Sequence, residues 1–166
     1  MSRAQPGPLP SLIGNQGLIQ QGVCERKMPE KILLEIVTPE RKILEAEVDR
    51  VEIPGLNGEL GILPGHTELV SQLKPAGLLT YYLNEVKEEM AISDGFVEVK
   101  PDRIVILADK AERPEDIDIA RALELKERAE RQLQKAMTDP EVDMARATSD
   151  LERASINIQL AEKARK

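Results

Sequence analysis

Between residues 31 and 108 the chain alternates apolar and polar side chains with the two-residue period of a β-strand. The clearest examples are residues 43–48 and 51–53, where aliphatic positions alternate with acidic ones. This alternation is typical of a sheet that exposes one face to water. No segment of helical period interrupts it, so we predict roughly eight to ten short strands, packed as an antiparallel β-sandwich or flattened barrel.

Turn-forming residues divide this region, because Gly and Asn tolerate positive φ angles and Pro presets the first position of a turn. They are densest in residues 51–79, where short apolar runs lie between Pro54-Gly55, Asn57-Gly58, Gly61, Pro64-Gly65, Pro75 and Gly77. Two further turns are predicted, at Leu83-Asn84-Glu85 and at Ser93-Asp94-Gly95. Each of these separates two expected strands.

After Glu112-Arg113-Pro114 the period changes to the spacing of three and four residues that marks an amphipathic helix. Pro114 fits the first turn of a helix, where its missing N–H is not needed. One apolar stripe comprises Ala122, Leu125, Ala129, Leu133 and Ala136, and a second comprises Met144, Ala147, Leu151, Ala154, Ile158 and Ala161. Between the stripes, Asp139 is the expected N-cap of the second helix and Pro140 its first residue.

Two such stripes joined by a short turn predict a C-terminal antiparallel hairpin of two helices, which makes the fold class α+β. Alanine occupies alternate contact positions in both stripes. It lets the helix axes approach closely but buries little area, whereas a fully buried Leu contributes roughly 1.5–3 kcal/mol. We therefore expect a hairpin that is helical yet weakly held, and able to detach or to open.

The chain divides into three parts: an N-terminal extension at 1–28, the sandwich at 29–112 and the hairpin at 113–166. The extension is rich in Gly and Pro and shows no sustained helical or strand period. Our preferred explanation is that Met28 is the true initiator. A disordered extension and a functional tail are the alternatives.

Composition excludes several functions. A net charge of −7 with only two Tyr, one Phe and no Trp argues against a nucleic-acid binder, which needs basic residues and usually stacking aromatics. A single cysteine, Cys24, indicates a reducing compartment. No run approaches eighteen apolar residues, so we expect that the chain does not span a membrane by itself.

Catalytic motifs are missing from the sequence. There is neither a G-x-x-x-x-G-K-[ST] phosphate loop nor a G-x-S-x-G nucleophile elbow. One His and one Cys cannot build a zinc site, so we expect no catalytic residue and no metal. The remaining interpretation is a binding module, with the sheet docking to one partner and the hairpin reaching another.

Four segments resemble the epsilon subunits of F-type ATP synthases. They are residues 58–66 (GELGILPGH), 73–77 (LKPAG), 93–99 (SDGFVEV) and 105–109 (VILAD). The resemblance extends from about residue 32 to the C-terminus, and the division into strands followed by a hairpin fits it. The alternative is a free-standing β-sandwich adaptor with a mobile helical arm, unrelated to energy coupling.

The resemblance implies a non-catalytic rotor subunit at the cytoplasmic face of the bacterial inner membrane. Its partners would be the gamma subunit, the ring of c subunits and, through the helical arm, the alpha and beta subunits of the catalytic head. It would contact the membrane only indirectly, through the ring of c subunits. In relatives this arm can fold beside the sandwich or extend along gamma into the catalytic head, where it blocks ATP hydrolysis. The residues implied to face the ring are Glu59, Gly61, Pro64 and His66. A His in a Pro-Gly loop is more simply a turn residue, and both interpretations can hold together.

The resemblance also implies a regulatory ATP site, although no cofactor is required. Some relatives bind ATP through I/L-D-x-x-R-A, which residues 117–122 reproduce. The residues implied are Glu112, Ile117, Asp118, Arg121, Ala122, Arg128 and Arg153. Asn157 departs from the pattern, because strong binders place an arginine there, and losing that contact would weaken affinity by about 1.5–3 kcal/mol. The competing explanation is a simple ion pair between Asp118 and Arg121 across one helical turn.

Overall fold

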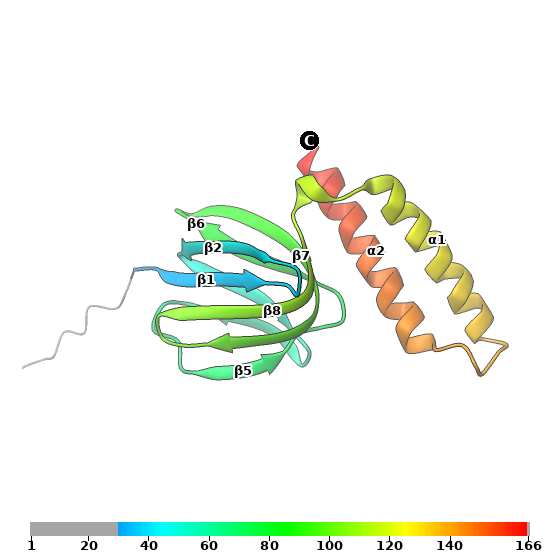
Figure 1. Ribbon diagram of the computed structural model, residues 1–166, viewed down its shortest axis with the longest axis horizontal. Coiled ribbons are helices and arrows are strands. Elements are labelled where there is room, and N and C mark those ends of the chain that lie inside the picture. Colours follow the sequence, from blue (N-terminus) through cyan, green and yellow to red (C-terminus); the bar gives the residue numbers. More distant parts are fainter. Residues whose placement is uncertain (1–29, 166) are drawn as a thin grey trace, which may run out of the picture.

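The computed structural model describes residues 30–165. A domain of β-strands is followed by two antiparallel helices that lie beside it (Figure 1). The predicted fold class, a β-sandwich with a C-terminal helical hairpin, is therefore confirmed. The predicted extension at 1–28 lies outside the described residues.

Eight strands form one continuous, folded sheet. They are β1 (Ile32–Val37), β2 (Lys42–Val48), β3 (Arg50–Gly55), β4 (Gly58–Ile62), β5 (Leu69–Gln72), β6 (Gly77–Leu83), β7 (Val86–Val99) and β8 (Arg103–Glu112). The order is β2-β1-β8-β7-β6-β3-β4, and β5 pairs with β7. The pairings are antiparallel except that of β1 with β8, which is parallel. Strands β2 and β4 thus form the two ends of the sheet.

The predicted turn at Leu83-Asn84-Glu85 is present, but the one at Ser93-Asp94-Gly95 is wrong. There β7 continues as a single strand of 14 residues. Asp94 and Gly95 do have positive φ angles, of 49° and 109°. These angles bend the strand instead of reversing it, because β8 stays paired with β7 on both sides of the bend. The first half of β7 pairs with β6 and the second with β5, which folds the sheet into two layers.

The core lies between these layers and is almost entirely aliphatic. Residues alternate between buried and partly exposed along β1, as the two-residue period requires. The largest fully buried side chains are Ile32, Leu34, Ile36, Ile53, Ile62, Leu73, Leu79, Met90, Ile92, Ile104 and Ile106. This core contains no residue of either helix.

A short 3-10 turn, η1 (Pro114–Asp116), leads into helices α1 (Ile119–Ala136) and α2 (Met144–Ala164). Asp118 caps α1 and Asp143 caps α2. The predicted start of the second helix at Asp139 and Pro140 is therefore wrong. The Asp139 carboxylate instead accepts the N–H of Glu141 at 3.1 Å, which closes a local turn in the connection.

The two helices meet along small side chains. Ala122, Ala129, Ala147 and Ala154 are buried, whereas Leu125 is 40% exposed and Met144 is 50% exposed. Helix α2 lies nearer the sandwich in Figure 1, and packs on it mainly through Leu160 and Ala161 against Ala91 of β7. The hairpin is therefore attached to the strands by one small apolar contact.

Candidate functional site

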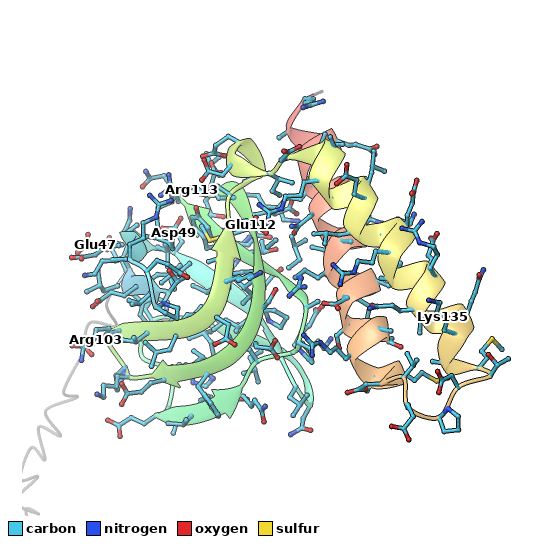
Figure 2. All side chains as sticks on the ribbon, turned by 45° about the vertical axis from the view of Figure 1, so that its right-hand side comes forward. Glu47, Asp49, Arg103, Glu112, Arg113 and Lys135 are labelled. Carbon is cyan, nitrogen blue, oxygen red and sulfur yellow. The ribbon has the colours of Figure 1, made fainter. Side chains whose placement is uncertain are left out.

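A cavity of about 450 Å³ lies at the base of the hairpin, where the end of β8 meets both helices. Glu112, labelled in Figure 2, marks the side of this cavity formed by the sandwich. Arg41 from the β1–β2 loop and Lys110 of β8 add positive charge to its wall. Six of the seven residues predicted for ATP line it, namely Glu112, Ile117, Asp118, Arg121, Ala122 and Arg153.

Asn157 forms a polar bridge across this cavity. Its Nδ2 donates to Oε2 of Glu112 at 2.7 Å. The side chain is only 8% exposed, and within residues 30–165 its Oδ1 is the one buried side-chain polar atom without a hydrogen-bond partner. A buried acceptor without a donor costs about 1–3 kcal/mol. A ligand that brought a donor to this wall would remove that cost.

Asp118 and Arg121 do not form the ion pair that was considered as an alternative. The Asp118 carboxylate accepts the backbone N–H of Arg121 at 3.2 Å and so caps α1. Among the described residues the Arg121 guanidinium has no salt-bridge partner. Its charge is thus available at the edge of the cavity.

Arg128, the seventh predicted residue, lies elsewhere. It lines a neighbouring cleft of about 500 Å³ between α1 and α2. Leu125 and Arg153 line both hollows, which are therefore neighbours. Arg153 also donates to Asp150 at 2.6 Å. The Arg153 side chain thus pairs with Asp150 of the same helix while it lines both hollows.

Arg153 also acts on the bend of β7. Burial raises the pKa of Asp94, and the carboxylate of Asp109 raises it further, while the positive charge of Arg153 opposes both effects. The guanidinium of α2 therefore lies within electrostatic reach of the sandwich. This places Arg153 between the two parts of the molecule.

A second polar contact holds the C-terminal end of α2. Lys163 donates to Glu89 of β7, and Lys87 contacts the other oxygen of the same carboxylate at 2.7 Å. The Glu89 side chain is only 9% exposed. Burial alone would raise its pKa, but the two lysines outweigh burial and hold the pKa of Glu89 below its usual value. Glu89 is therefore a charged anchor for the hairpin.

The residues implied to face the ring lie along one edge of the sheet. Glu59 and Gly61 are exposed on β4, the terminal strand, whereas Pro64 and His66 follow its end. His66 is half-buried, and its Nδ1 donates to the carbonyl of Thr67 at 2.7 Å. The structure thus places Glu59 on β4 itself and His66 in the loop that follows this strand.

Sequence reasoning missed four basic residues at these sites, Arg41, Lys110, Arg146 and Lys163. Arg41 and Lys110 reach the base cavity from the strands, and Arg146 lines the cleft between the helices. Lys110 stands two residues before Glu112, and a strand's period alone would have placed both on one face. No local sequence signal marks Arg41, because the cavity that it lines forms only where the docked hairpin meets the sandwich.

Residues 30–165 contain no group of three His, Cys, Asp or Glu side chains arranged to hold a metal ion. In that same range no helix is long and apolar enough to cross a membrane. The sandwich and its lightly attached hairpin, with cavities at their junction, define a two-part binding module.

Comparison with known proteins assigns this module to a family. Residues 31–114 match the model of the ATP synthase delta/epsilon chain β-sandwich domain, and residues 115–164 match that of its long α-helix domain. The chain belongs to the ATP synthase delta/epsilon chain family, as the sequence motifs indicated, and it is a non-catalytic subunit of that complex.

The relatives are similar over nearly their whole length. The ATP synthase epsilon chain of Dehalococcoides mccartyi is 45% identical over 136 residues, which are 82% of this chain and 96% of that one. The epsilon chain of Syntrophobacter fumaroxidans is 46% identical over 136 residues, 82% of this chain and 99% of that one.

A solved assembly shows the same architecture. A chain in the Euglena gracilis mitochondrial ATP synthase, in a structure of OSCP, F1 and the c-ring, is 27% identical with a TM-score of 0.67. The match covers 98% of this chain and 91% of that chain. The similarity therefore extends over both the sandwich and the hairpin.

Proposed function

We propose that this chain couples rotation of the c ring to ATP synthesis as a rotor subunit, and that its helical hairpin regulates ATP hydrolysis by leaving the sandwich. The observation that carries this proposal is the small contact between α2 and the strands. Leu160 and Ala161 of α2 are buried in it with Ala91 and Ile117, and the only further apolar side chains of this cluster are the partly buried Ile119 and Ile156. An element held by so little apolar area can exchange between a docked and a released state.

The β4 edge is the proposed contact with the c ring. Leu56 and Leu63 are 46% and 59% exposed at the two ends of β4, near Glu59 and His66 respectively. The loop between β4 and β5 is held in place, because the N–H of its Gly65 donates to the carbonyl of Pro101 at 2.8 Å. Exposed apolar side chains on a fixed edge suit a protein contact better than contact with water.

The outer face of the other layer is the proposed contact with the gamma subunit. Val70, Phe96 and Leu107 are 72%, 55% and 55% exposed on the neighbouring strands β5, β7 and β8. Phe96 and Leu107 are direct cross-strand partners. Together they form an apolar patch of the kind that marks an interaction surface.

The base cavity is the proposed site for a regulatory nucleotide. Its volume lies within the range usual for small-molecule sites, about 300–1,000 Å³. Arg121 and Arg153 offer charge-assisted hydrogen bonds to phosphate, and the free acceptor of Asn157 suits an amino group. Because both the sandwich and α2 form the walls, a bound nucleotide would favour the docked hairpin. This assembly would sit peripherally, at the cytoplasmic face of the bacterial inner membrane.

The decisive experiment adds the purified chain to a catalytic head complex that lacks this subunit, with co-migration and ATP hydrolysis followed together. Co-migration with a fall in hydrolysis is expected. A variant truncated after Arg113 should still co-migrate without inhibiting, since Arg113 itself donates to the carbonyl of Ile43 and closes the sandwich.

Co-migration without any inhibition would retain the rotor role and remove the regulatory one. A chain that fails to join a head complex from the same organism would contradict the rotor role and favour a free-standing adaptor.

A further inference from the structure

The turn between β3 and β4 carries the only Asn-Gly pair of the sequence, Asn57-Gly58. Asparagine is a thermolabile residue. The backbone nitrogen of the following residue can attack its side-chain amide carbon, and a glycine leaves that nitrogen unshielded. Both residues are exposed, and a Cβ built at Gly58 would meet nothing within 4 Å. Neither burial nor crowding therefore protects this pair.

The other two asparagines of the described residues lack these conditions. Asn84 precedes a glutamate, and its Oδ1 accepts a hydrogen bond from Nζ of Lys31 at 2.6 Å. Asn157 is buried and hydrogen-bonded. Within residues 30–165 the Asn57 side chain makes no hydrogen bond that would hold its amide away from the backbone. Asn57 is thus the asparagine of this range most open to reaction.

An Asp-Gly pair can undergo the same attack, and the sequence has one, Asp94-Gly95. Its backbone is held in the bend of β7. The N–H of Asp94 donates to the carbonyl of Lys74 at 3.0 Å, and the carbonyl of Gly95 accepts from the N–H of Leu73 at 2.9 Å. A Cβ on Gly95 would lie 1.9 Å from the carbonyl oxygen of Leu107, so the backbone has no room to rotate. Packing therefore blocks the reaction at this pair.

The turn at Asn57 can open, because it lies at one end of the sheet. In the described part of the chain β4 pairs only with β3, and this pairing ends at Gly55 and Gly58. Local opening costs least where backbone hydrogen bonds are exposed and few apolar contacts hold the segment. The N–H of Leu56 donates to the carbonyl of Gln72 at 2.8 Å, which anchors the residue before Asn57. Opening therefore moves mainly the Gly58 side of the turn.

We propose that Asn57-Gly58 is a site of spontaneous isoaspartate formation. The nitrogen of Gly58 attacks Cγ of Asn57, so that an N–Cγ bond forms and the Cγ–Nδ2 bond breaks. Nδ2 leaves as ammonia and takes the proton of the Gly58 nitrogen. Water then opens the cyclic imide, giving aspartate if the N–Cγ bond breaks and isoaspartate if the original peptide bond breaks. Asparagine and water thus become aspartate or isoaspartate and ammonia, and no atom is oxidised or reduced.

Both products add a negative charge next to Gly58 and Glu59, and isoaspartate also lengthens the main chain by a methylene group. A two-residue turn sets the register of its strands, so the longer backbone disturbs the pairing of Gly55 with Gly58. The consequence for binding rests on the proposed function, in which this edge contacts the c ring. The modified edge binds the ring less well, so the contact weakens as the chain ages.

The test is peptide mapping by mass spectrometry, after the full-length chain has been incubated at constant temperature and pH in water enriched in heavy oxygen. Asn57 should take up solvent oxygen about tenfold or more faster than Asn84 or Asn157. Asn57→Gln places the amide one carbon farther from the backbone and should abolish the modification at this turn. Asn84→Gln is the matched control and should leave the rate at Asn57 unchanged. Circular dichroism shows whether each variant keeps its fold.

Two results would overturn the site: equal rates at the three asparagines, or an Asn57 that stays intact in the folded chain while the same residue reacts in a chain unfolded by urea. Faster modification of Asp94 than of Asn57 would also contradict it, because packing would then not control the reaction.

Ring binding is measured separately, by co-sedimentation with a c-ring complex that contains gamma and lacks this subunit. The aged wild-type chain should bind less than the fresh one, whereas aged and fresh Asn57→Gln should bind equally. Modification with unchanged binding would overturn the consequence for the ring. A fresh chain that does not bind would contradict the ring contact of the proposed function, and the mapping result would stand by itself.

Discussion

Asn157 of α2 and Glu112 at the end of β8 are 45 residues apart, yet a hydrogen bond of 2.7 Å joins their side chains. The bond lies beside the small apolar contact that attaches the hairpin to the sandwich. A side chain at the position of departure from the family's nucleotide-binding pattern is thus a structural link in this chain. Removing the Asn157 side chain should therefore weaken docking of the hairpin more than it destabilises the strands.

We expect Asn157→Ala to weaken docking by less than about 1 kcal/mol, because it leaves the half-buried Glu112 without its donor but also removes the unpaired Oδ1. Amide hydrogen exchange should accelerate in α2 and stay unchanged in β1 and β8. Gln159→Ala is the control, since Gln159 is exposed on the same helix. Equal acceleration in strands and helix would show that Asn157 supports the whole fold and not the docking alone.

Asn157→Arg should strengthen the binding of a nucleotide in the base cavity. It restores the arginine of the family pattern in the wall of the base cavity, and a charge-assisted contact adds about 1.5–3 kcal/mol. ATP affinity, measured by titration calorimetry, should therefore rise about tenfold or more. An unchanged affinity would remove this wall from the nucleotide site.

The contact between Glu89 and Lys163 should make docking depend on pH. Because the pKa of Glu89 is lowered in the folded chain, its contribution is complete above the ordinary value of 4.5 and is lost as pH falls through the lowered pKa. Lys163→Ala should cost about 0.5–1 kcal/mol at pH 7. It should also reduce the loss of α2 protection in acid, as hydrogen exchange would report.

Lys135→Ala is the matched control for this pair, since Lys135 lies at the far end of α1 from Glu112 in Figure 2. It should change neither the protection of α2 at neutral pH nor its loss in acid. An acid response in Lys163→Ala as large as in the wild-type chain would assign the pH dependence to other carboxylates.

Gly95→Ala should destabilise the sandwich by about 3 kcal/mol or more, because a Cβ there would lie 1.9 Å from the carbonyl oxygen of Leu107 at a φ of +109°. Gly61→Ala meets nothing within 4 Å and should cost less than about 1 kcal/mol. Urea unfolding of both variants checks the contrast. Similar losses of unfolding free energy in the two variants would show that the bend of β7 does not require glycine at position 95.

The two main periodicities were enough to predict the architecture, since alternation specified the strands and the spacing of three and four specified the helices. The bend of β7 could not be predicted from the sequence, for a physical reason. Positive φ angles at Asp94 and Gly95 carry the same local signature whether a strand reverses or continues. Only the partner strand β8, paired on both sides, decides between the two outcomes.

Helix ends and site residues show the same division. Asp139 and Asp143 are both reasonable N-caps by residue type, but Asp143 caps α2 while Asp139 accepts the N–H of Glu141. The motif at 117–122 places four of its residues at the base cavity, and the resemblance adds Glu112 and Arg153. Arg128 fell into the neighbouring cleft, and Arg146 was missed, because both depend on how the two helices face each other.

The parallel pairing of β1 with β8 has a consequence for synthesis of the chain. Leu33 pairs with Arg103 and Val37 with Leu107, so each partner is made seventy residues after the first strand. A nascent chain leaving the ribosome cannot complete its sandwich until β8 has emerged, and closing so long a loop is slow. The hairpin contacts are local and form quickly once α2 is made. Translation order therefore delivers the docking surface first and the element that docks on it last.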